Sequence, residues 1–171
     1  TFANDTVKCF GESNGAIHAT ANGGTPVYTY TFSNGTQNQT GDATSLNANT
    51  YTVTITDAMG CSMVYTTVVE EPAAVGLVAT SVLPVDLTLG DSKALEVTSN
   101  YSNAVYQWTP ATGLSCTNCP NPTVTIYNSL QYQVTASVSP HGKVCSEQIA
   151  FPVQVTKNYT LYIPNAFTPN A

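Results

Sequence analysis

Few residues of this sequence could do chemistry, and its five cysteines stand first among them. Cys116 and Cys119 form a Cys-x-x-Cys pair, a spacing that both redox-active sites and zinc sites use. A redox site needs its first cysteine at the start of a helix, and the Gly- and Pro-containing stretch 113–122 predicts none. Zinc stays an alternative, because His141 and Cys145 could complete a Cys3His set. We expect a local disulfide between Cys116 and Cys119, with Cys145 left as a buried free thiol.

The histidines and acidic residues show no arrangement typical of catalysis. His18 lies in a strand-like run and is expected to be exposed, whereas His141 lies in a Pro- and Gly-containing turn. The sequence contains no phosphate-binding loop, paired-carboxylate signature or zinc-protease helix. The acidic residues lack the spacing of a calcium loop, which leaves Asp57 with Glu70 and Glu71 as the remaining calcium alternative. The sequence therefore predicts no enzyme, no catalytic residue, no metal and no cofactor.

Composition excludes several classes of partner. Charged residues make up 8% of the chain, the net charge is -6, and arginine is absent. Such a chain cannot follow or clamp a phosphate backbone, so nucleic acid is excluded as a partner. The longest apolar-leaning stretch, 73–85, is interrupted by polar residues and a proline and is shorter than the roughly 20 residues that span a bilayer. We therefore expect no membrane insertion. The first residues show no signal pattern, so we expect the chain to be part of a longer protein.

Short β-type runs separated by turn signals organise the whole sequence. In residues 51–56 the apolar side chains alternate with threonines, which predicts a half-buried strand. A Gly-containing turn follows and leads into a second β-type run, so we expect a hairpin. Pro72, directly after two glutamates, marks a short linker. The pattern predicts an all-β fold with two tandem antiparallel β-sandwich domains, at residues 1–71 and 72–157, and a tail at 158–171.

Cys9 and Cys61 stand near the two ends of the first predicted domain. An acidic, arginine-free chain with several cysteines is typical of an oxidising compartment. A bond between Cys9 and Cys61 would close a long loop and stabilise the domain by about 4 kcal/mol. Two buried free thiols are the alternative. We expect the disulfide.

Three stretches of the first domain carry a pattern: residues 9–15 (CFGESNG), 23–30 (GGTPVYTY) and 51–61 (YTVTITDAMGC). In this order they resemble the repeat of gliding-motility surface adhesins, the SprB-type repeat. Val27 and Phe32 stand where that family often has Pro and Trp. Asn49 replaces a usual Gly, and Asn is among the few residues that enter the left-handed region readily. The resemblance implies a cell-surface adhesin module.

Two stretches of the second domain, 107–110 (QWTP) and 113–122 (GLSCTNCPNP), resemble immunoglobulin-like (PKD-like) modules that often follow such repeats. Trp108 would then anchor the core from a central strand. The tail, 162–170 (YIPNAFTPN), resembles the opening of the C-terminal sorting domain of type 9 secretion cargo, without the Gly-Asp-Gly stretch that should come next. This resemblance implies export by the type 9 secretion machinery, acting through a sorting domain that this sequence lacks, and an extracellular location at the cell surface.

These observations predict a non-enzymatic extracellular stalk or adhesin segment that acts as a disulfide-stabilised spacer near the sorting domain. The short linker predicts an extended pair of modules. Surface glycans and neighbouring repeats are the candidate partners. The stretch Asp5-Thr6-Val7 resembles an O-glycosylation sequon of gliding bacteria, so Thr6 is a candidate modification site. The alternative function is a carbohydrate-binding module of a secreted polysaccharide-degrading enzyme, which an exposed row of coplanar aromatic side chains would favour.

Overall fold

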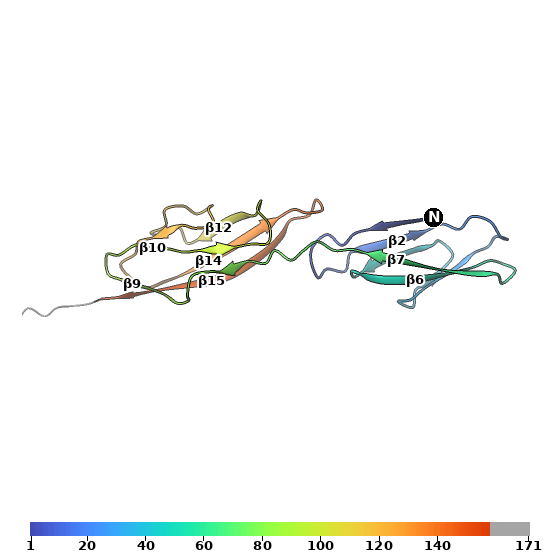
Figure 1. Cartoon of the computed structure of the whole chain (residues 1–171), viewed down its shortest axis with the longest axis horizontal. Coiled ribbons are helices and arrows are strands. Elements are labelled where there is room, and N and C mark those ends of the chain that lie inside the picture. Colours follow the sequence, from blue (N-terminus) through green and yellow to red (C-terminus); the bar gives the residue numbers. More distant parts are fainter. Residues whose placement is uncertain (158–171) are drawn as a thin grey trace, which may run out of the picture. The chain divides into compact units, whose positions relative to one another are not determined.

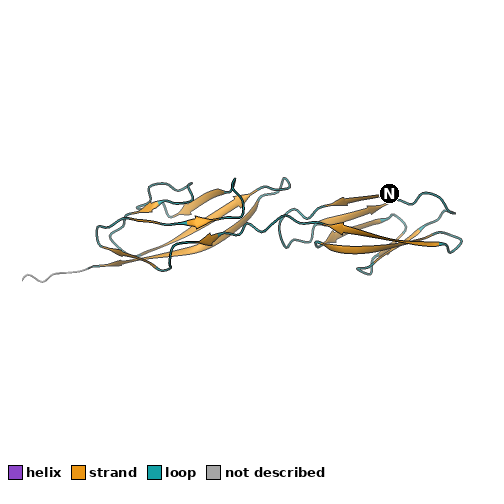
Figure 2. Ribbon diagram, viewed as in Figure 1, coloured by secondary structure: helices purple, strands orange, loops and turns teal. Residues whose placement is uncertain are grey.

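A computed structural model describes residues 1–157, and every regular element in that range is a β-strand (Figure 1, Figure 2). The strands belong to two compact units. The first consists of Thr1–Gly76, Ser99–Ala104 and Ala136–Glu147, and the second of Leu77–Thr98, Val105–Thr135 and the described residues from Gln148 on. The expected all-β class with two tandem sandwiches is confirmed. Residues 1–157 contain no helix that could cross a bilayer.

The first unit contains two sheets, in which all paired strands are antiparallel. One sheet has the order β1-β2-β5, with β1 at Phe2–Asp5, β2 at Gly15–Ala19 and β5 at Asp42–Leu46. The other has the order β4-β3-β6-β7, with β3 at Thr29–Phe32, β4 at Gln37–Asn38, β6 at Asn49–Thr56 and β7 at Ser62–Val69. The predicted hairpin is therefore β6 with β7, and β7 is an end strand of its sheet.

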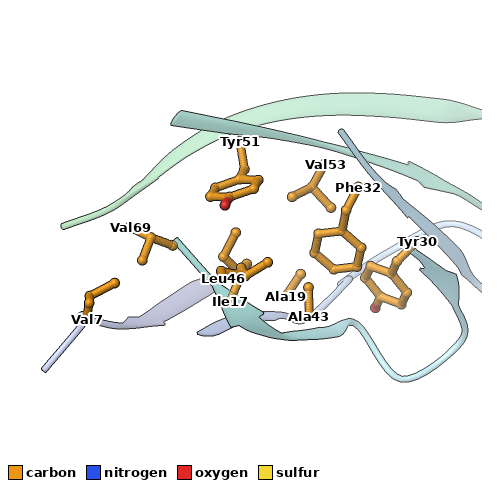
Figure 3. Packing of buried hydrophobic residues seen from close by; sticks show 10 residues of the cluster. All are labelled: Val7, Ile17, Ala19, Tyr30, Phe32, Ala43, Leu46, Tyr51, Val53 and Val69. Atoms are coloured by element: carbon orange, nitrogen blue, oxygen red, sulfur yellow. The ribbon is translucent and has the colours of Figure 1, made fainter. Parts of the chain in front are cut away.

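The core of the first unit lies between its two sheets. The alternation in β6 explains how the sheet β4-β3-β6-β7 contributes to this core. Tyr51 and Val53 are buried, while the alternate residues Thr50 and Thr52 are exposed. Figure 3 shows the apolar side chains that meet there: Val7, Ile17, Ala19, Tyr30, Phe32, Ala43, Leu46, Tyr51, Val53 and Val69. Each large apolar side chain buried in this way contributes about 1.5–3 kcal/mol to stability. The packed core fixes the positions of the strands that carry the polar sites described below.

The second unit is built from shorter strands and the greater part of two long ones, β14 and β15. The last residues of β14 and the first of β15 belong to the segment Ala136–Glu147 of the first unit. Its sheets have the orders β12-β14-β15-β9, β10-β13 and β11-β8. Strands β9 and β15 pair in parallel, with Val85 opposite Val153, which departs from the expected purely antiparallel arrangement. The long stretch of chain between them allows this crossover. The bounds are β8 Val78–Ala79, β9 Val85–Thr88, β10 Lys93–Ala94, β11 Val97–Thr98, β12 Val105–Thr109, β13 Thr123–Val124, β14 Leu130–Val138 and β15 Cys145–Thr156.

Trp108 anchors the core of the second unit, as predicted. Its side chain is fully buried, and its ring meets Phe151 edge-on with the ring centroids 5.3 Å apart. The indole N–H donates a hydrogen bond of 2.9 Å to the carbonyl oxygen of Cys119, so the one polar atom of the ring is satisfied. Strand β12, which carries Trp108, is an end strand of its sheet and not a central one.

Candidate functional site

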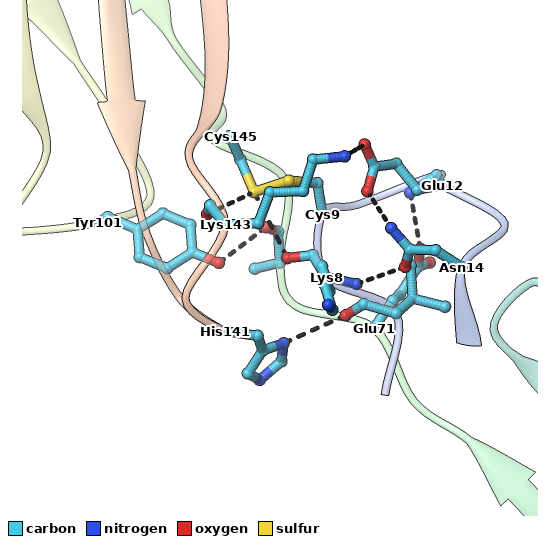
Figure 4. Close-up of a disulfide and its surroundings, with 12 residues drawn as sticks. Lys8, Cys9, Glu12, Asn14, Glu71, Tyr101, His141, Lys143 and Cys145 are labelled. Carbon is cyan, nitrogen blue, oxygen red and sulfur yellow. Dashed lines mark hydrogen bonds and ion pairs between the residues drawn. A yellow bond between two sulfur atoms is a disulfide. The ribbon is translucent and has the colours of Figure 1, made fainter. Parts of the chain in front are cut away.

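The first unit contains a disulfide between Cys9 and Cys145, which are 136 positions apart in the sequence. Cys9 follows β1 in the loop toward β2, and Cys145 is the first residue of β15. Their Cα atoms lie 5.6 Å apart, which is typical of a disulfide. Figure 4 shows the bond between the loop that holds Lys8 and Cys9 and the segment that holds Lys143 and Cys145. One covalent bond therefore closes most of the described chain into a loop.

Polar contacts on both sides of this disulfide hold the same two segments together (Figure 4). Lys143 forms an ion pair with Glu12, and the hydrogen bond from its ammonium group is the main reason that the pKa of the Glu12 carboxyl is lowered. His141 Nδ1 lies 3.2 Å from the carbonyl oxygen of Val7. Because Lys143 and Glu12 are both partly exposed, their ion pair adds little stability, and the covalent bond dominates.

The expected pairing of Cys9 with Cys61 is wrong. The backbone N–H of Val7 donates to the carbonyl oxygen of Glu70, so Cys9 lies beside the C-terminal end of β7. Cys61 precedes the N-terminal end of the same strand, roughly 30 Å away at the rise of an extended chain. A disulfide cannot bridge that distance. Cys61 is an exposed free thiol, and Cys145, expected to be free, is bonded.

The Cys-x-x-Cys pair lies in the second unit, where Cys116 and Cys119 form a disulfide. Neither sulfur is then a thiolate that could bind zinc or attack a substrate. The zinc alternative fails at its other two members as well. Cys145 is consumed by the bond to Cys9, and His141 contacts the Val7 carbonyl in the first unit. The four residues are not brought together as a metal site.

His18 joins a polar cluster that the sequence did not reveal. Strand β2 lies between β1 and β5, and this register places Asp42 opposite His18. His18 Nδ1 lies 2.8 Å from Asp42 Oδ1, and its Nε2 lies 3.6 Å from Asp5 Oδ2. The hydrogen bond with Asp42 is the largest cause of the raised pKa of the His18 imidazole. Both ring nitrogens face carboxylates, and all three side chains are largely exposed.

Asp57 organises the turn between β6 and β7. Its Oδ1 accepts hydrogen bonds of 2.9 Å from the backbone N–H groups of both Met59 and Cys61, and its Oδ2 accepts one of 3.0 Å from Thr25. These backbone donors favour the charged carboxylate, with the bond from Thr25 first among them, and so lower the pKa of Asp57. The side chain thus ties the β6–β7 turn to the loop before β3. Gly24 in that loop has a φ of +75° and no room for a Cβ beside Asp57.

We expect Asp57→Ala to lower the melting temperature of the first unit by several degrees, because three backbone donors lose their acceptor. The wild-type chain should lose the same contribution as the pH falls through the pKa of Asp57, since a carboxylate with a lowered pKa stabilises only while it is charged. Thermal unfolding followed by circular dichroism from pH 7 to pH 2 measures both effects. Asp86→Ala, at an exposed position of β9, is the matched control and should change little. Equal melting temperatures for Asp57→Ala and the wild type at pH 7 would contradict the role of this turn.

The calcium alternative is also wrong for these residues. Asp57 lies before β7, while Glu70 and Glu71 lie after it, so the whole length of that strand separates them. Glu71 Oε2 instead accepts a hydrogen bond of 2.7 Å from the backbone N–H of Gly11. Within residues 1–157 no group of three or more acidic, histidine or cysteine side chains is arranged to hold a metal ion.

A groove of about 460 Å³ opens along the side of the first unit. Its apolar lining comes from Phe2 on β1, from Tyr28 and Ile55, and from Met63 and Tyr65 on β7. Its volume falls within the range of small-ligand pockets. Alternation along β7 puts Met63 and Tyr65 on the core-facing side, yet 58% and 42% of their surface is exposed. Sequence periodicity could identify the core-facing side of β7. It could not show that the opposite sheet leaves Met63 and Tyr65 on that side uncovered.

Exposed aromatic side chains do not form the row that a glycan-binding surface would need. Three are exposed in residues 1–157, namely Phe10 in a loop, Tyr65 on β7 and Tyr127 between β13 and β14. The ring of Tyr65 contacts the ring of Phe2, which is tilted by 53° relative to it at a centroid distance of 5.2 Å. These rings are not coplanar, so they do not offer one flat platform to a sugar chain.

Thr6, the candidate O-glycosylation site, lies directly after β1 and is half-buried. Its neighbour Val7 is fully buried and hydrogen-bonded to Glu70. Glycosylation of Thr6 stays a prediction. The expected sorting-domain strand at 162–170 lies outside the described residues and also stays a prediction.

Sequence comparison connects part of the first unit with a known family. Residues 5–37 match the SprB repeat. The matched stretch runs from the end of β1 to the start of β4 and includes Cys9 and His18. This confirms the first part of the expected resemblance. No curated protein matches the chain in sequence.

Among solved structures, the chain is similar to DIP-gamma IG1+IG2, with 10% identity and a TM-score of 0.42, covering 94% of this chain and 98% of that one. The immunoglobulin domains 1–5 of Sidekick-1 share 12% identity at a TM-score of 0.38, over 90% of this chain and 38% of theirs. Murine CEACAM1b shares 13% identity at a TM-score of 0.35, over 85% of this chain and 94% of that one. The chain thus spans well under half of the Sidekick-1 segment, and this likeness carries no information about what it binds.

Proposed function

We propose that this chain is a non-enzymatic extracellular segment of a cell-surface adhesin. It would act as a spacer near the C-terminal sorting domain of a protein exported by the type 9 secretion machinery. The match of residues 5–37 to the SprB repeat supports the adhesin part of the proposal. Two disulfides fit an oxidising compartment outside the cytoplasm. Export by the type 9 route rests on the resemblance of the tail at 162–170 alone.

The observation that carries the spacer role is the covalent connection of Cys9 to Cys145. Tension applied between Thr1 and Lys157 passes along residues 1–9, crosses the disulfide and leaves along β15. A covalent bond does not yield at forces that separate hydrogen-bonded strands. Of the strands in residues 1–157, only β1 and β15 then lie on the load path. Most of both cores lies within the closed loop, so the segment can hold tension without being drawn out.

The competing proposal is a carbohydrate-binding module of a secreted polysaccharide-degrading enzyme. The groove lined by Phe2 and Tyr65 is the feature that favours it, because aromatic rings stack on sugars. The tilt between those two rings favours the spacer. Neighbouring repeats are therefore better candidate partners for the segment than surface glycans.

Cell-surface exposure can be tested with an epitope tag inserted between Asn34 and Gly35, in the exposed turn between β3 and β4. Exposed turn tips tolerate insertions, so the fold should survive. We expect an antibody to stain intact cells that produce the tagged full-length parent protein, and not to stain cells that carry the same tag on a cytosolic protein. Staining that appears only after the cells are permeabilised would overturn the surface location. Retardation of the purified chain by a soluble polysaccharide in affinity electrophoresis would favour the carbohydrate-binding module.

A further inference from the structure

We propose that the open edge of β7 is a docking site for β7 of a second copy of this chain. Strand β7 pairs with β6 on one side only. On its other side, two hydrogen bonds cover the C-terminal end of the strand. Asn4 Nδ2 donates a hydrogen bond of 2.8 Å to the carbonyl oxygen of Val68, and the backbone N–H of Val7 donates one of 2.8 Å to the carbonyl oxygen of Glu70. Within residues 1–157, no backbone hydrogen bond from another segment reaches the rest of that edge, from Ser62 to Thr66.

The hydrogen-bond phase of the hairpin shows which groups point outward. The backbone N–H of Asp57 donates a hydrogen bond of 2.9 Å to the carbonyl oxygen of Cys61, so the backbone groups of Cys61 point toward β6. In an antiparallel pair, alternate residues face the same partner. The backbone groups of Ser62, Val64 and Thr66 therefore point away from β6, in the same phase as the Val68 carbonyl that Asn4 contacts. The open edge offers the N–H and C=O groups of three residues.

The side chains along this edge favour another strand as the occupant. Met63, Val64 and Tyr65 are all exposed, and the stretch Ser62–Val69 contains no charged residue. Natural proteins usually protect an exposed edge strand with lysine, proline or a bulge, and β7 has none of these in its open part. The apolar groove beside Met63 and Tyr65 would be covered by an added strand.

The arrangement is self-complementary, which identifies the occupant as a second copy. A two-fold antiparallel pairing centred on Val64 places Val64 opposite Val64 of the second copy and Ser62 opposite Thr66 of the second copy. All three outward-facing residues then exchange backbone hydrogen bonds. The same register places Met63 opposite Tyr65, a favourable pairing of sulfur with an aromatic ring. Between Ser62 and Thr66 every cross-strand neighbour is uncharged, so the paired part of the isologous contact contains no repulsion between like charges.

Sedimentation equilibrium of the full chain tests the proposal. We expect the apparent mass to rise with concentration from 18.0 kDa toward twice that value, for the wild type and equally for Cys61→Ser. Val64→Lys should stay monomeric, because it places two ammonium groups opposite each other, while its exposed position leaves the fold intact. The control Val105→Lys, equally exposed on β12, should associate like the wild type.

A wild-type chain that stays monomeric at all concentrations would overturn the proposal. If an oligosaccharide or a foreign peptide were then found to bind in the groove, that molecule would be the occupant instead. Association that survives Val64→Lys, or that disappears in Cys61→Ser, would also overturn it. The latter result would mean a dimer linked through the exposed thiol of Cys61.

Engineered cysteines test the register. In a Cys61→Ser background, Val64→Cys should give a disulfide-linked dimer on mild oxidation, because the two Cα atoms would lie about 5.5 Å apart. Val68→Cys is the matched control on the same strand and face. The two Cα atoms at that position would lie about 26 Å apart, so no linked dimer should form. Equal crosslinking at both positions, or none at Val64→Cys, would overturn the register.

Discussion

Reduction of the Cys9–Cys145 disulfide should lengthen the chain that a pulling experiment extracts by about 470 Å. This follows from the 136 positions that the closed bond removes from the load path, at about 3.3–3.6 Å for each extended residue. Single-molecule force spectroscopy on the full chain, held through its two termini, would measure the contour length with and without reductant. The variant with Cys9→Ser and Cys145→Ser should behave as the reduced chain does.

The second disulfide provides a matched control for this experiment. Because Cys116 and Cys119 lie inside the closed loop, replacing both with serine should leave the contour length of the oxidised chain unchanged. A gain of only about 180 Å on reduction would instead indicate a bond from Cys9 to Cys61. No gain at all would contradict a Cys9–Cys145 bond that carries the tension and, with it, the proposed spacer mechanism.

The bond should also affect equilibrium stability. A closed loop of this length restricts the unfolded chain, and its loss is expected to lower the free energy of unfolding by up to about 5 kcal/mol. Chemical denaturation of the Cys9→Ser, Cys145→Ser variant would therefore begin at a clearly lower denaturant concentration than that of the wild type.

Trp108→Ala should lower the free energy of unfolding of the second unit by about 3–5 kcal/mol. The substitution removes a fully buried ring and its edge-on contact with Phe151. It also leaves the carbonyl oxygen of Cys119 without its indole donor. Because Trp108 is the chain's one tryptophan, urea denaturation of the variant has to be followed by circular dichroism.

Val105→Ala is the control for this prediction, since Val105 lies on the same strand and is exposed. It should change the free energy of unfolding by no more than about 0.5 kcal/mol. A loss below about 1 kcal/mol for Trp108→Ala would contradict the anchoring role, because a core that tolerates the removal of so large a side chain is not closely packed around it.

Local patterns in the sequence determined much of the fold. The alternation of apolar residues with threonines in 51–56 predicted β6, because successive side chains of a strand point to opposite faces. The large apolar ring of Trp108 predicted its place in a core. The spacing of Cys116 and Cys119 was enough to expect a local bond, since two residues between the cysteines already hold them close together. Each of these features depends on near neighbours in the chain.

The tertiary structure alone decided which distant groups meet. Cys9 and Cys61 bracket a domain in the sequence, but the pairing of β6 with β7 puts them at opposite ends of one strand. The partner of Cys9 comes from 136 positions away, a separation over which residue patterns carry no distance information. The contact of His18 with Asp42 likewise depends on the register of two strands. The open edge of β7 exists because the order of strands in the sheet ends there, and that order is set by packing rather than by any local signal.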